Sequence, residues 1–433
     1  MSGLQDLLAS RAALTPWLDA LARDIFDQLH QKTRGEHGVT RASWGTGETI
    51  ACDLLKARAQ SLDLATRSDG IGNLYVELPG RDRSAPRWVS GSHLDAVPEG
   101  GNFDGAAGAV AALLAMSIFK KTGVMPARDV WAVGFRGEEA SSWFTGLHNS
   151  HLGSRAALGI LPDSELDTAI HRQSGLSFRQ HLQQGGFAWP ASGAAKNDLR
   201  PDTTHGFIEL HIEQGPILET ANIPVGVVTA IRGSLRARNG KVTGEYAHSG
   251  AVPHYLRKDA VFAAAEFARE CEDFADGARD ASEDIDVTFG EFTTNGDTHG
   301  LTKVAGELRF TIDVRSSSSM LLDRCGTEFQ QIAKRISDKR GVAVTTGDFA
   351  KSDPAVMDPG LISALEANAR ELNIRTMALP SGAGHDAADV ARCGIPTAMI
   401  FVRNANGSHN PDERMEISDF LQGVWVLAAT LAR

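Results

Sequence analysis

The spacing of apolar residues changes several times along the chain, and each spacing predicts a type of secondary structure. From Leu14 to Ile25 apolar residues recur every three or four positions, which predicts a helix within the first 35 residues. Apolar runs at 88–92 and 130–135 predict buried strands, and the alanine-rich stretch 105–119 between them predicts a helix. Strands that alternate with helices predict an α/β fold whose mostly parallel sheet is flanked by helices.

A different pattern occupies the middle of the chain. The stretch 225–242 has the pattern of a strand, and residues 308–315 alternate apolar with polar side chains, as a half-buried strand does. Each of these stretches is followed by the three- to four-residue spacing of a helix. We therefore predict a small α+β domain at 223–342, inserted into an α/β domain that comprises residues 1–222 and 343–433.

Composition and charge exclude several classes of protein. The 433 residues carry a formal net charge of −11, which is unlike the basic surface of a protein that binds nucleic acid or anionic membranes. The four cysteines are far apart and form no CxxC pair, so neither a disulfide scaffold nor a cysteine-rich zinc module is expected. The sequence shows no signal peptide, and no apolar run reaches the roughly 18 residues of a transmembrane helix. We therefore expect a cytoplasmic protein that binds neither nucleic acid nor membranes.

Histidines and acids follow the predicted strands, where sites form in open α/β sheets. Considered singly, each has an ordinary explanation. Asp104 suits the N-cap of a helix, and the adjacent acids Glu138 and Glu139 suit a solvated loop. His93 and Asp95 suit a surface loop, although a metal ligand and the carboxylate that orients it have the same spacing.

His211 and His409 extend this set. His211 lies between Glu209 and Glu213 on one face of a predicted strand, where either a metal ligand or a polar surface residue would fit. His409 follows the apolar strand 398–402. Taken together, histidines and carboxylates at separate strand ends, without cysteine, suit two divalent cations bridged by one carboxylate. Such a pair of ions activates water and polarises a carbonyl group.

Seven short motifs occur in a characteristic order. They are Gly-Ser-His-Leu-Asp at 91–95, Gly-Asn-Phe-Asp-Gly at 101–105, Glu-Glu at 138–139, His-Ile-Glu-Gln-Gly-Pro at 211–216, Ala-His-Ser-Gly at 247–250, Ser-Gly-Ala-Gly-His-Asp-Ala at 381–387 and Ser-His-Asn-Pro at 408–411. In this order the sequence resembles the family of N-carbamoyl-L-amino acid hydrolases and allantoate amidohydrolases. These are dimetal amidohydrolases related to zinc exopeptidases and aminoacylases. The resemblance covers roughly residues 38 to 416.

The resemblance implies two divalent metal ions per subunit, of which Zn, Mn, Co and Ni are all suitable. Asp95 would orient one of the ligands, and Glu138 would be the general base that takes a proton from water and returns it to the leaving amine. Asp104 would bridge the two ions. The ligands would be His93, Asp104 and His211 for one ion, and Asp104, Glu139 and His409 for the other.

The resemblance also implies a substrate site. Gln214 and His385 would contact the carbamoyl or amide group of a small substrate that carries a carboxylate. The inserted domain would be the lid and dimerisation domain of a homodimer, and His248 would reach into the partner subunit's site to stabilise the oxyanion. Arg315 would hold the substrate carboxylate in a fork. Without the resemblance, a set of surface salt bridges would be the preferred explanation of His248 and Arg315.

The departures from the family fall on the substrate side. Thr302 stands where the family has a substrate-binding Asn, and the residues after the lid histidine, 250–254, differ as well. The implied activity is metal-dependent cleavage of a linear, non-peptide C–N bond in an N-carbamoyl amino acid or ureido acid, with release of ammonia and carbon dioxide. The alternatives are an N-acyl amino acid amidase or dipeptidase with the same metal centre, and a catalytically inactive binding protein.

Overall fold

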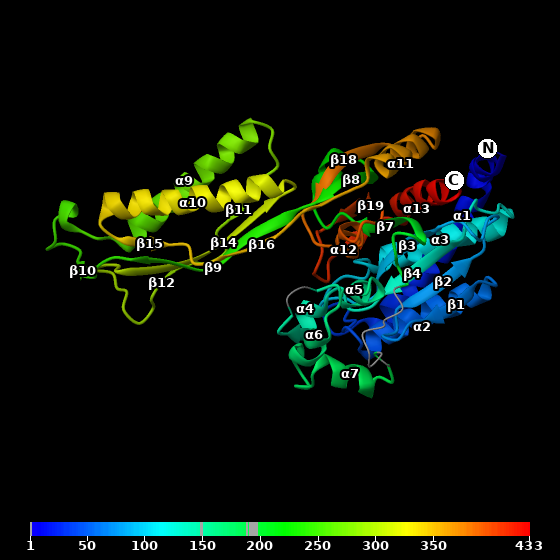
Figure 1. Cartoon of the computed structure of the whole chain (residues 1–433), viewed down its shortest axis with the longest axis horizontal. Coiled ribbons are helices and arrows are strands. Elements are labelled where there is room, and N and C mark those ends of the chain that lie inside the picture. Colours follow the sequence, from blue (N-terminus) through cyan, green and yellow to red (C-terminus); the bar gives the residue numbers. More distant parts are fainter. Residues whose placement is uncertain (1, 148–149, 188, 190–197) are drawn as a thin grey trace. The chain divides into compact units, whose positions relative to one another are not determined.

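The chain forms two compact units, each with its own hydrophobic core (Figure 1). The computed structural model describes residues 2–147, 150–187, 189 and 198–433. The main unit comprises Met1–Thr229 and Met357–Arg433, and the inserted unit comprises Ala230–Val356.

A nine-stranded mixed sheet forms the centre of the main unit. Its central strands β4, β3, β7 and β19 run parallel, whereas the outer strands pair antiparallel. The predicted α/β fold is thereby confirmed, with the parallel part at the centre of the sheet. In sheet order the strands are β1 (Ala65–Ser68), β2 (Leu74–Leu78), β4 (Val130–Phe135), β3 (Arg87–His93), β7 (Thr204–Ile212), β19 (Thr397–Val402), β8 (Val225–Ile231) and β17 (Ala355–Val356), with β18 (Thr376–Ser381) also beside β8.

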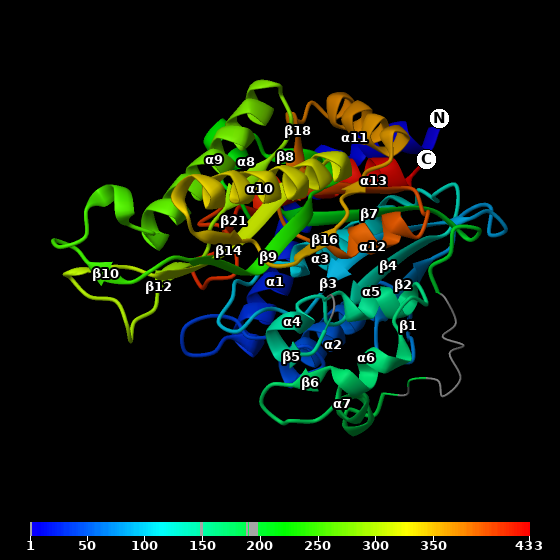
Figure 2. The ribbon, with the colours of Figure 1, turned by 60° about the vertical axis from the view of Figure 1, so that its left-hand side comes forward.

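Helices cover both faces of this sheet, so most side chains of its central strands are buried. On one face α3 and α13 share an apolar cluster with Ile208 and Leu210 of β7, and α11 packs beside α13 (Figure 2). On the other face the backbone N–H of Ala387 in α12 donates to Glu209, which alternates with these apolar residues along β7. The helices of these layers are α1 (Ser2–Thr33), α2 (Thr46–Ser61), α3 (Ala106–Thr122), α11 (Pro359–Glu371), α12 (Asp386–Arg392) and α13 (Ile417–Leu431).

Shorter elements connect these layers. They are α4 (Ala140–Trp143), β5 (Phe144–Thr145), α5 (Leu152–Ala157), α6 (Asp163–Thr168), β6 (Ile170–His171), α7 (Phe178–Gln184), α8 (Ile217–Ala221), β20 (Asn404–Ala405) and β21 (Arg414–Met415). The parallel direction of the central strands gathers several loops at one edge of the sheet. His93 is the last residue of β3, His211 lies at the end of β7, Glu138 follows β4 and His409 follows β19. The same edge therefore carries all four side chains.

An antiparallel six-stranded sheet and two helices form the inserted unit. Along its long strand β14, the apolar residues from Leu308 to Val314 are buried against α9 and α10, while the residues between them are not. This confirms the predicted alternation. The elements are β9 (Gly233–Thr243), β10 (Ala247–His248), a 3₁₀ turn (His254–Leu256), α9 (Ala260–Asp280), β11 (Asp286–Thr288), β12 (Phe292–Thr294), β13 (Lys303–Val304), β14 (Glu307–Ser316), α10 (Ser319–Arg340), β15 (Ala343–Thr345) and β16 (Phe349–Ser352).

Two boundaries differ from those read from the sequence. The stretch 225–242 is two strands rather than one, because β8 pairs with β19 of the main unit and β9 pairs with β14 of the inserted unit. The inserted unit extends to Val356, beyond the predicted end at 342, because β15 and β16 pair with β9. These two strands leave most of their side chains accessible, so no apolar alternation marks them in the sequence.

Two further findings concern the expected environment of the protein. Within the described ranges, no helix is both long and apolar enough to cross a membrane. All four cysteines are free thiols, and Cys271 and Cys325 lie in the core of the inserted unit.

The core of the inserted unit can be tested through helix α9, where Phe267 is fully buried and Phe262 is 57% exposed. We expect Phe267→Ala to destabilise the inserted unit by about 3–5 kcal/mol through loss of buried area and the cavity left behind. Phe262→Ala on the same helix should change stability by less than about 0.5 kcal/mol. All seven tryptophans lie in the main unit, so circular dichroism follows both units during urea unfolding while tryptophan fluorescence follows one. Equal effects of the two substitutions would contradict this assignment of the core.

Candidate metal centre

Two histidines and an aspartate converge at the carboxyl edge of the sheet. Nε2 of His211 lies 3.2 Å from Oδ1 of Asp104, and Nε2 of His93 lies 3.5 Å from the same oxygen. All three side chains are almost fully buried. We call this group the histidine cluster; its ligand atoms lie close enough together to hold one metal ion.

A second group shares the same aspartate. Nε2 of His409 lies 3.3 Å from Oδ2 of Asp104 and 2.8 Å from Oε1 of Glu139. We call Asp104, Glu139 and His409 the outer cluster, because half of the His409 side chain is exposed. Burial raises the pKa of Glu139 to about 7, although the hydrogen bond from His409 opposes the rise.

The two oxygens of Asp104 therefore face different clusters: Oδ1 faces the histidine cluster and Oδ2 faces the outer cluster. Burial alone would raise the pKa of Asp104, but the neighbouring side chains of His211, His409 and His93 hold the pKa well below its ordinary value. Its Oδ1 is buried, and none of the described groups forms a hydrogen bond with it. The carboxylate does not cap α3: Gly105 occupies the N-cap, at φ +64°, and a Cβ there would lie 2.3 Å from the ring of His93. The N-cap interpretation of Asp104 is therefore wrong.

The donor set fits two divalent cations. Nδ1 of His93 and Nδ1 of His211 lie 3.1 Å and 2.8 Å from the backbone oxygens of Asp95 and Ile212, so each ring directs Nε2 toward Asp104. A histidine that ligates a metal commonly donates its other N–H in this way. Imidazole nitrogens and carboxylate oxygens suit Zn, Mn, Co and Ni alike, so the donors do not select one metal.

Buried carboxylates shape the loop that carries Glu138 and Glu139. The Asp95 carboxylate accepts the backbone N–H groups of both residues, at 3.1 and 3.0 Å, and the hydroxyl of Ser43 at 2.6 Å. Its Oδ1 also lies 3.3 Å from Nδ1 of His93. One step earlier along the loop, Glu48 accepts the N–H of Gly137 at 2.9 Å. Asp95 therefore couples the orientation of His93 to the position of both glutamates.

Glu138 lies beside the histidine cluster with its two oxygens in different surroundings. Oε2 lies 3.9 Å from Nε2 of His93, and Oε1 lies 3.1 Å from Nε2 of His151. Burial would raise the pKa of Glu138, but the charges of His151 and His93 outweigh it and lower the pKa. Glu138 is thus a buried, ionised carboxylate that can accept a proton.

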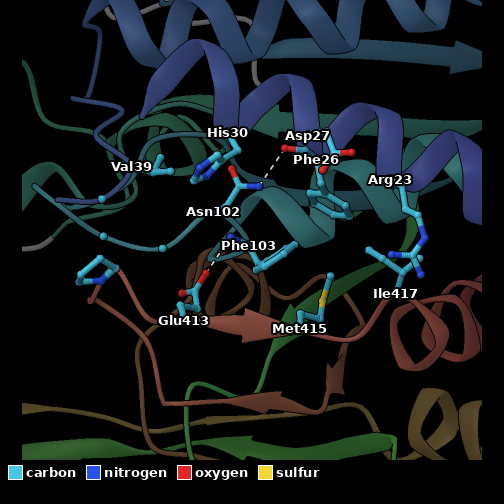
Figure 3. Close-up of a pocket in the computed structure, with 14 residues that line it drawn as sticks. Arg23, Phe26, Asp27, His30, Val39, Asn102, Phe103, Glu413, Met415 and Ile417 are labelled. Atoms are coloured by element: carbon cyan, nitrogen blue, oxygen red, sulfur yellow. Dashed lines mark hydrogen bonds between the residues drawn. The ribbon is translucent and has the colours of Figure 1, made fainter. Parts of the chain in front are cut away.

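The loop before Asp104 is held by a further acid, Glu413. Its Oε1 accepts the N–H groups of Phe103 and Asp104 at 2.7 and 3.2 Å, as Figure 3 shows for Phe103. The Ser408 hydroxyl lies between Oε2 of Glu413 and Oδ2 of Asp104. One hydroxyl donates one proton, so Ser408 can donate to only one of these two acids. Burial together with the charge of Asp104 raises the pKa of Glu413. The outer side of this loop borders a pocket of about 320 Å³ beside α1.

The residues expected to contact the substrate lie in both units. In the main unit, Nε2 of Gln214 donates to Oδ2 of Asp104 at 2.9 Å, and Nε2 of His385 lies 2.9 Å from the Ser381 hydroxyl. His385 is buried, and its ring centroid is 4.5 Å from that of His211. Burial and the neighbouring charge of His211 lower the pKa of His385 well below its ordinary value, so it is neutral.

The inserted unit carries His248, Thr302 and Arg315. Nδ1 of His248 accepts the backbone N–H groups of Gly250 and Ala251, both at 3.1 Å, so Nε2 carries the proton of the neutral ring. The backbone oxygen of Thr302 accepts the N–H of Ser249 at 2.9 Å. Nε of Arg315 donates to Asp313 at 2.9–3.0 Å, which is the surface ion pair considered from the sequence.

Several residues of the site carry no recognisable sequence signal. Glu413, Asp389 and His151 reach it from segments that lie outside the motifs. In the sequence Glu209 stands out only as a neighbour of His211, yet its carboxylate is fully buried and accepts from Ser92 at 2.6 Å and from Ala387 at 2.9 Å. A buried acid beside a motif histidine is the one signal that would have indicated it.

Glu413 provides a test of the metal centre. We expect Glu413→Ala to weaken zinc binding by about 10–100-fold, because the N–H groups of Phe103 and Asp104 lose their acceptor and the loop is released. Glu413→Gln should stay within a few-fold of the wild type, since its amide accepts through oxygen and donates to Ser408 through nitrogen. Competition with a fluorescent chelator measures both, and circular dichroism confirms folding. Unchanged zinc affinity in the alanine variant would contradict the role of Glu413.

Comparison with known proteins agrees with this geometry. Residues 89–433 match the model of peptidase family M20/M25/M40. The chain is 34% identical to the N-carbamoyl-L-amino-acid amidohydrolase of Paenarthrobacter aurescens, over 90% of this chain and 92% of that one. It is 33% identical to the allantoate amidohydrolase of Escherichia coli (strain K12), over 96% and 95%.

A solved structure shows the same fold. The hydantoinase/carbamoylase family amidase of Burkholderia ambifaria superposes with a TM-score of 0.83 at 27% identity, covering 95% of this chain and 94% of that one. The order of the motifs, the two ligand clusters of the main unit and these matches agree. The chain belongs to peptidase family M20/M25/M40 and, within it, to the family of N-carbamoyl-L-amino acid hydrolases and allantoate amidohydrolases.

Proposed function

We propose that the protein is an amidohydrolase that cleaves a linear, non-peptide C–N bond in an N-carbamoyl amino acid or a ureido acid. The observation that carries this proposal is the Asp104 carboxylate, whose two oxygens face two ligand clusters while Glu138 stands beside them. The names of the relatives at 34% and 33% identity support the same class of bond.

The metal ligands follow from the two clusters. His93, Asp104 and His211 would hold one divalent ion, and Asp104, Glu139 and His409 the other. When bound, such ions lower the pKa of water and polarise a carbonyl group. The fixed Nδ1 contacts of His93 and His211 keep both rings oriented for this purpose.

Glu138 would act as the general base. Its carboxylate accepts a proton from water as the water oxygen bonds to the carbamoyl carbon. It then returns the proton to the departing nitrogen when the C–N bond breaks. An N-carbamoyl substrate thereby yields the free amine and carbamic acid, which decomposes to ammonia and carbon dioxide. Burial beside His93 places Glu138 out of bulk water, where such a transfer is effective.

The substrate-binding roles are those that the family resemblance implies. Gln214 and His385 would contact the carbamoyl or amide group, and Arg315 would bind the substrate carboxylate through its remaining N–H groups. The inserted unit would serve as lid and dimerisation domain, with His248 of the partner subunit stabilising the oxyanion. The protonated Nε2 of His248 supports this role, because an oxyanion needs a donor.

One observation favours a second candidate activity. Thr302 replaces the family's substrate-binding Asn, and its hydroxyl is shorter and offers one donor where an amide offers two. The same centre could then hydrolyse an N-acyl amino acid or a dipeptide. A catalytically inactive binding protein is the remaining alternative, and the complete set of ligands with Glu138 argues against it.

A substrate panel tests the proposed function. Protein stripped of metal and reloaded separately with Zn, Mn, Co or Ni is incubated with N-carbamoyl amino acids, ureido acids, N-acetyl amino acids and dipeptides. We expect metal-dependent release of ammonia from an N-carbamoyl or ureido compound. Amine release from N-acetyl compounds or dipeptides, without ammonia, would instead support the second activity, hydrolysis of an N-acyl amino acid or a dipeptide. A metal-loaded protein that is inert on the whole panel would favour the binding protein.

The role of Glu138 has its own test. We expect Glu138→Gln to lower kcat by about 10²–10⁴-fold, because the amide cannot accept the proton, while metal content stays at the wild-type level. Glu99→Gln is the matched control, since Glu99 is exposed in the loop between β3 and α3. Turnover and metal content are measured on the same samples. Near-wild-type turnover in the Glu138 variant would rule it out as the base.

A further inference from the structure

A histidine outside the sequence motifs connects the proposed base to a helix on the opposite side of the loop. Nε2 of His151 lies 3.1 Å from Oε1 of Glu138, and Nδ1 lies 2.8 Å from Oδ2 of Asp389 in α12. The three side chains are 14%, 9% and 7% exposed. They form a buried line of carboxylate, imidazole and carboxylate that ends at the metal centre.

The chemistry of these groups sets the direction of the hydrogen bonds. Ionised carboxylates only accept, so both ring nitrogens of His151 must donate. The ring is therefore held from both sides, with Asp389 fixing its orientation through Nδ1 and Glu138 receiving the N–H at Nε2. Hydrogen bonds between charged groups are roughly twice as strong as neutral ones.

The backbone conformation at His151 places this residue next to Glu138. Its φ of +61° lies in the left-handed region, which costs a non-glycine residue energy and marks a position imposed by its surroundings. Its N–H donates to the backbone oxygen of Glu138 at 3.1 Å, and the next residue, Leu152, bonds to Gly137 in the same way. The chain at 151–153 thus runs alongside the loop that carries the base.

The hydrogen bond from His151 fixes the orientation of the Glu138 carboxylate. Oε1 is occupied by the N–H of His151, while Oε2 faces His93, 3.9 Å away. The two oxygens of a carboxylate are equivalent, so the bond from His151 does not select between them but fixes the plane of the group. In that plane one oxygen accepts from His151 and the other points toward the histidine cluster.

We propose that His151 is a positioning residue for the general base: held by Asp389, it donates to Oε1 of Glu138 and leaves Oε2 as the proton acceptor on the side of the metal centre. This inference rests on the proposed function, because it assigns Glu138 the role of base. It adds to the reaction a residue that touches neither the substrate nor the ligand atoms.

A purely structural role would also be consistent with some of these contacts. The Ser154 hydroxyl donates to Asp386 at 2.5 Å, so α5 and α12 are joined next to the His151–Asp389 pair as well. If His151 served only to join these helices, its loss would lower stability and activity independently of Glu138. The experiment must therefore separate an effect through Glu138 from a general one.

A double-mutant cycle makes this separation. The variants are His151→Leu, His151→Gln, Glu138→Gln and the combination of His151→Leu with Glu138→Gln, each loaded with the metal that supports wild-type turnover. His205→Gln is the matched control, because His205 packs on Trp88 at the far end of β7 from His211. Metal content, melting temperature, kcat and KM are measured for every variant.

We expect His151→Leu to lower kcat by about 10²-fold with KM within three-fold and metal content unchanged. His151→Gln should recover most of this loss, since its amide nitrogen can donate to Oε1 of Glu138. In the Glu138→Gln background the leucine substitution should have little further effect, because the two residues act as one unit. An equal loss of kcat in both backgrounds, or no rescue by glutamine, would overturn the proposal.

Crystal structures of the two His151 variants give a readout that needs no turnover. In His151→Leu we expect the Glu138 carboxylate to rotate away from the orientation in which Oε2 faces His93, and in His151→Gln to keep it. An unchanged Glu138 in the leucine variant would overturn the proposal even if activity fell. A wild-type protein inert on the substrate panel would refute the proposed function, whereas the structures would still decide whether His151 positions Glu138.

Discussion

A buried negative charge is the constraint around which the site of the main unit is organised. Asp104 is 4% exposed, and an ionised carboxylate at such a position costs several kcal/mol unless its surroundings compensate it. Three histidines, together with the amide of Gln214 and the hydroxyl of Ser408, supply that compensation. The partners of Asp104 come from the end of β3, from the end of β7 with the residues after it, and from the loop between β20 and β21, so the fold must hold three separate segments together.

Further buried acids provide much of that support without facing the centre directly. Asp95, Glu48 and Glu413 each accept backbone N–H groups from the loops that carry the candidate ligands or the base. Carboxylates are suited to this task because their oxygens accept several hydrogen bonds in fixed directions. Carboxylates thus have two roles in the main unit. Some face the candidate metal centre, and others accept backbone N–H groups and fix the loops that carry the first set.

The inserted unit follows a different physical plan. Its antiparallel sheet buries one face against α9 and α10, and the polar residues of β14, among them Arg315, lie on the other. Its core is separate from that of the main unit, so its polar loops and strand face can vary while the core is kept. The departures from the family pattern that are expected from the sequence, at Thr302 and residues 250–254, lie in the inserted unit, whereas every candidate metal ligand lies in the main unit.

The sequence by itself determined the periodic parts of this protein. The helix of the first 33 residues, the buried strands β3 and β4 and the alternation along β14 follow from local apolar spacing, and the candidate ligands follow from motifs at the ends of such strands. The split between β8 and β9, the weakly marked strands β15 and β16, and the partnership of His151, Asp389 and Glu138 were decided only by tertiary structure. Hydrogen bonds between residues as far apart as 151 and 389 leave no periodic trace in the chain, because the spacing that matters is set by packing in three dimensions.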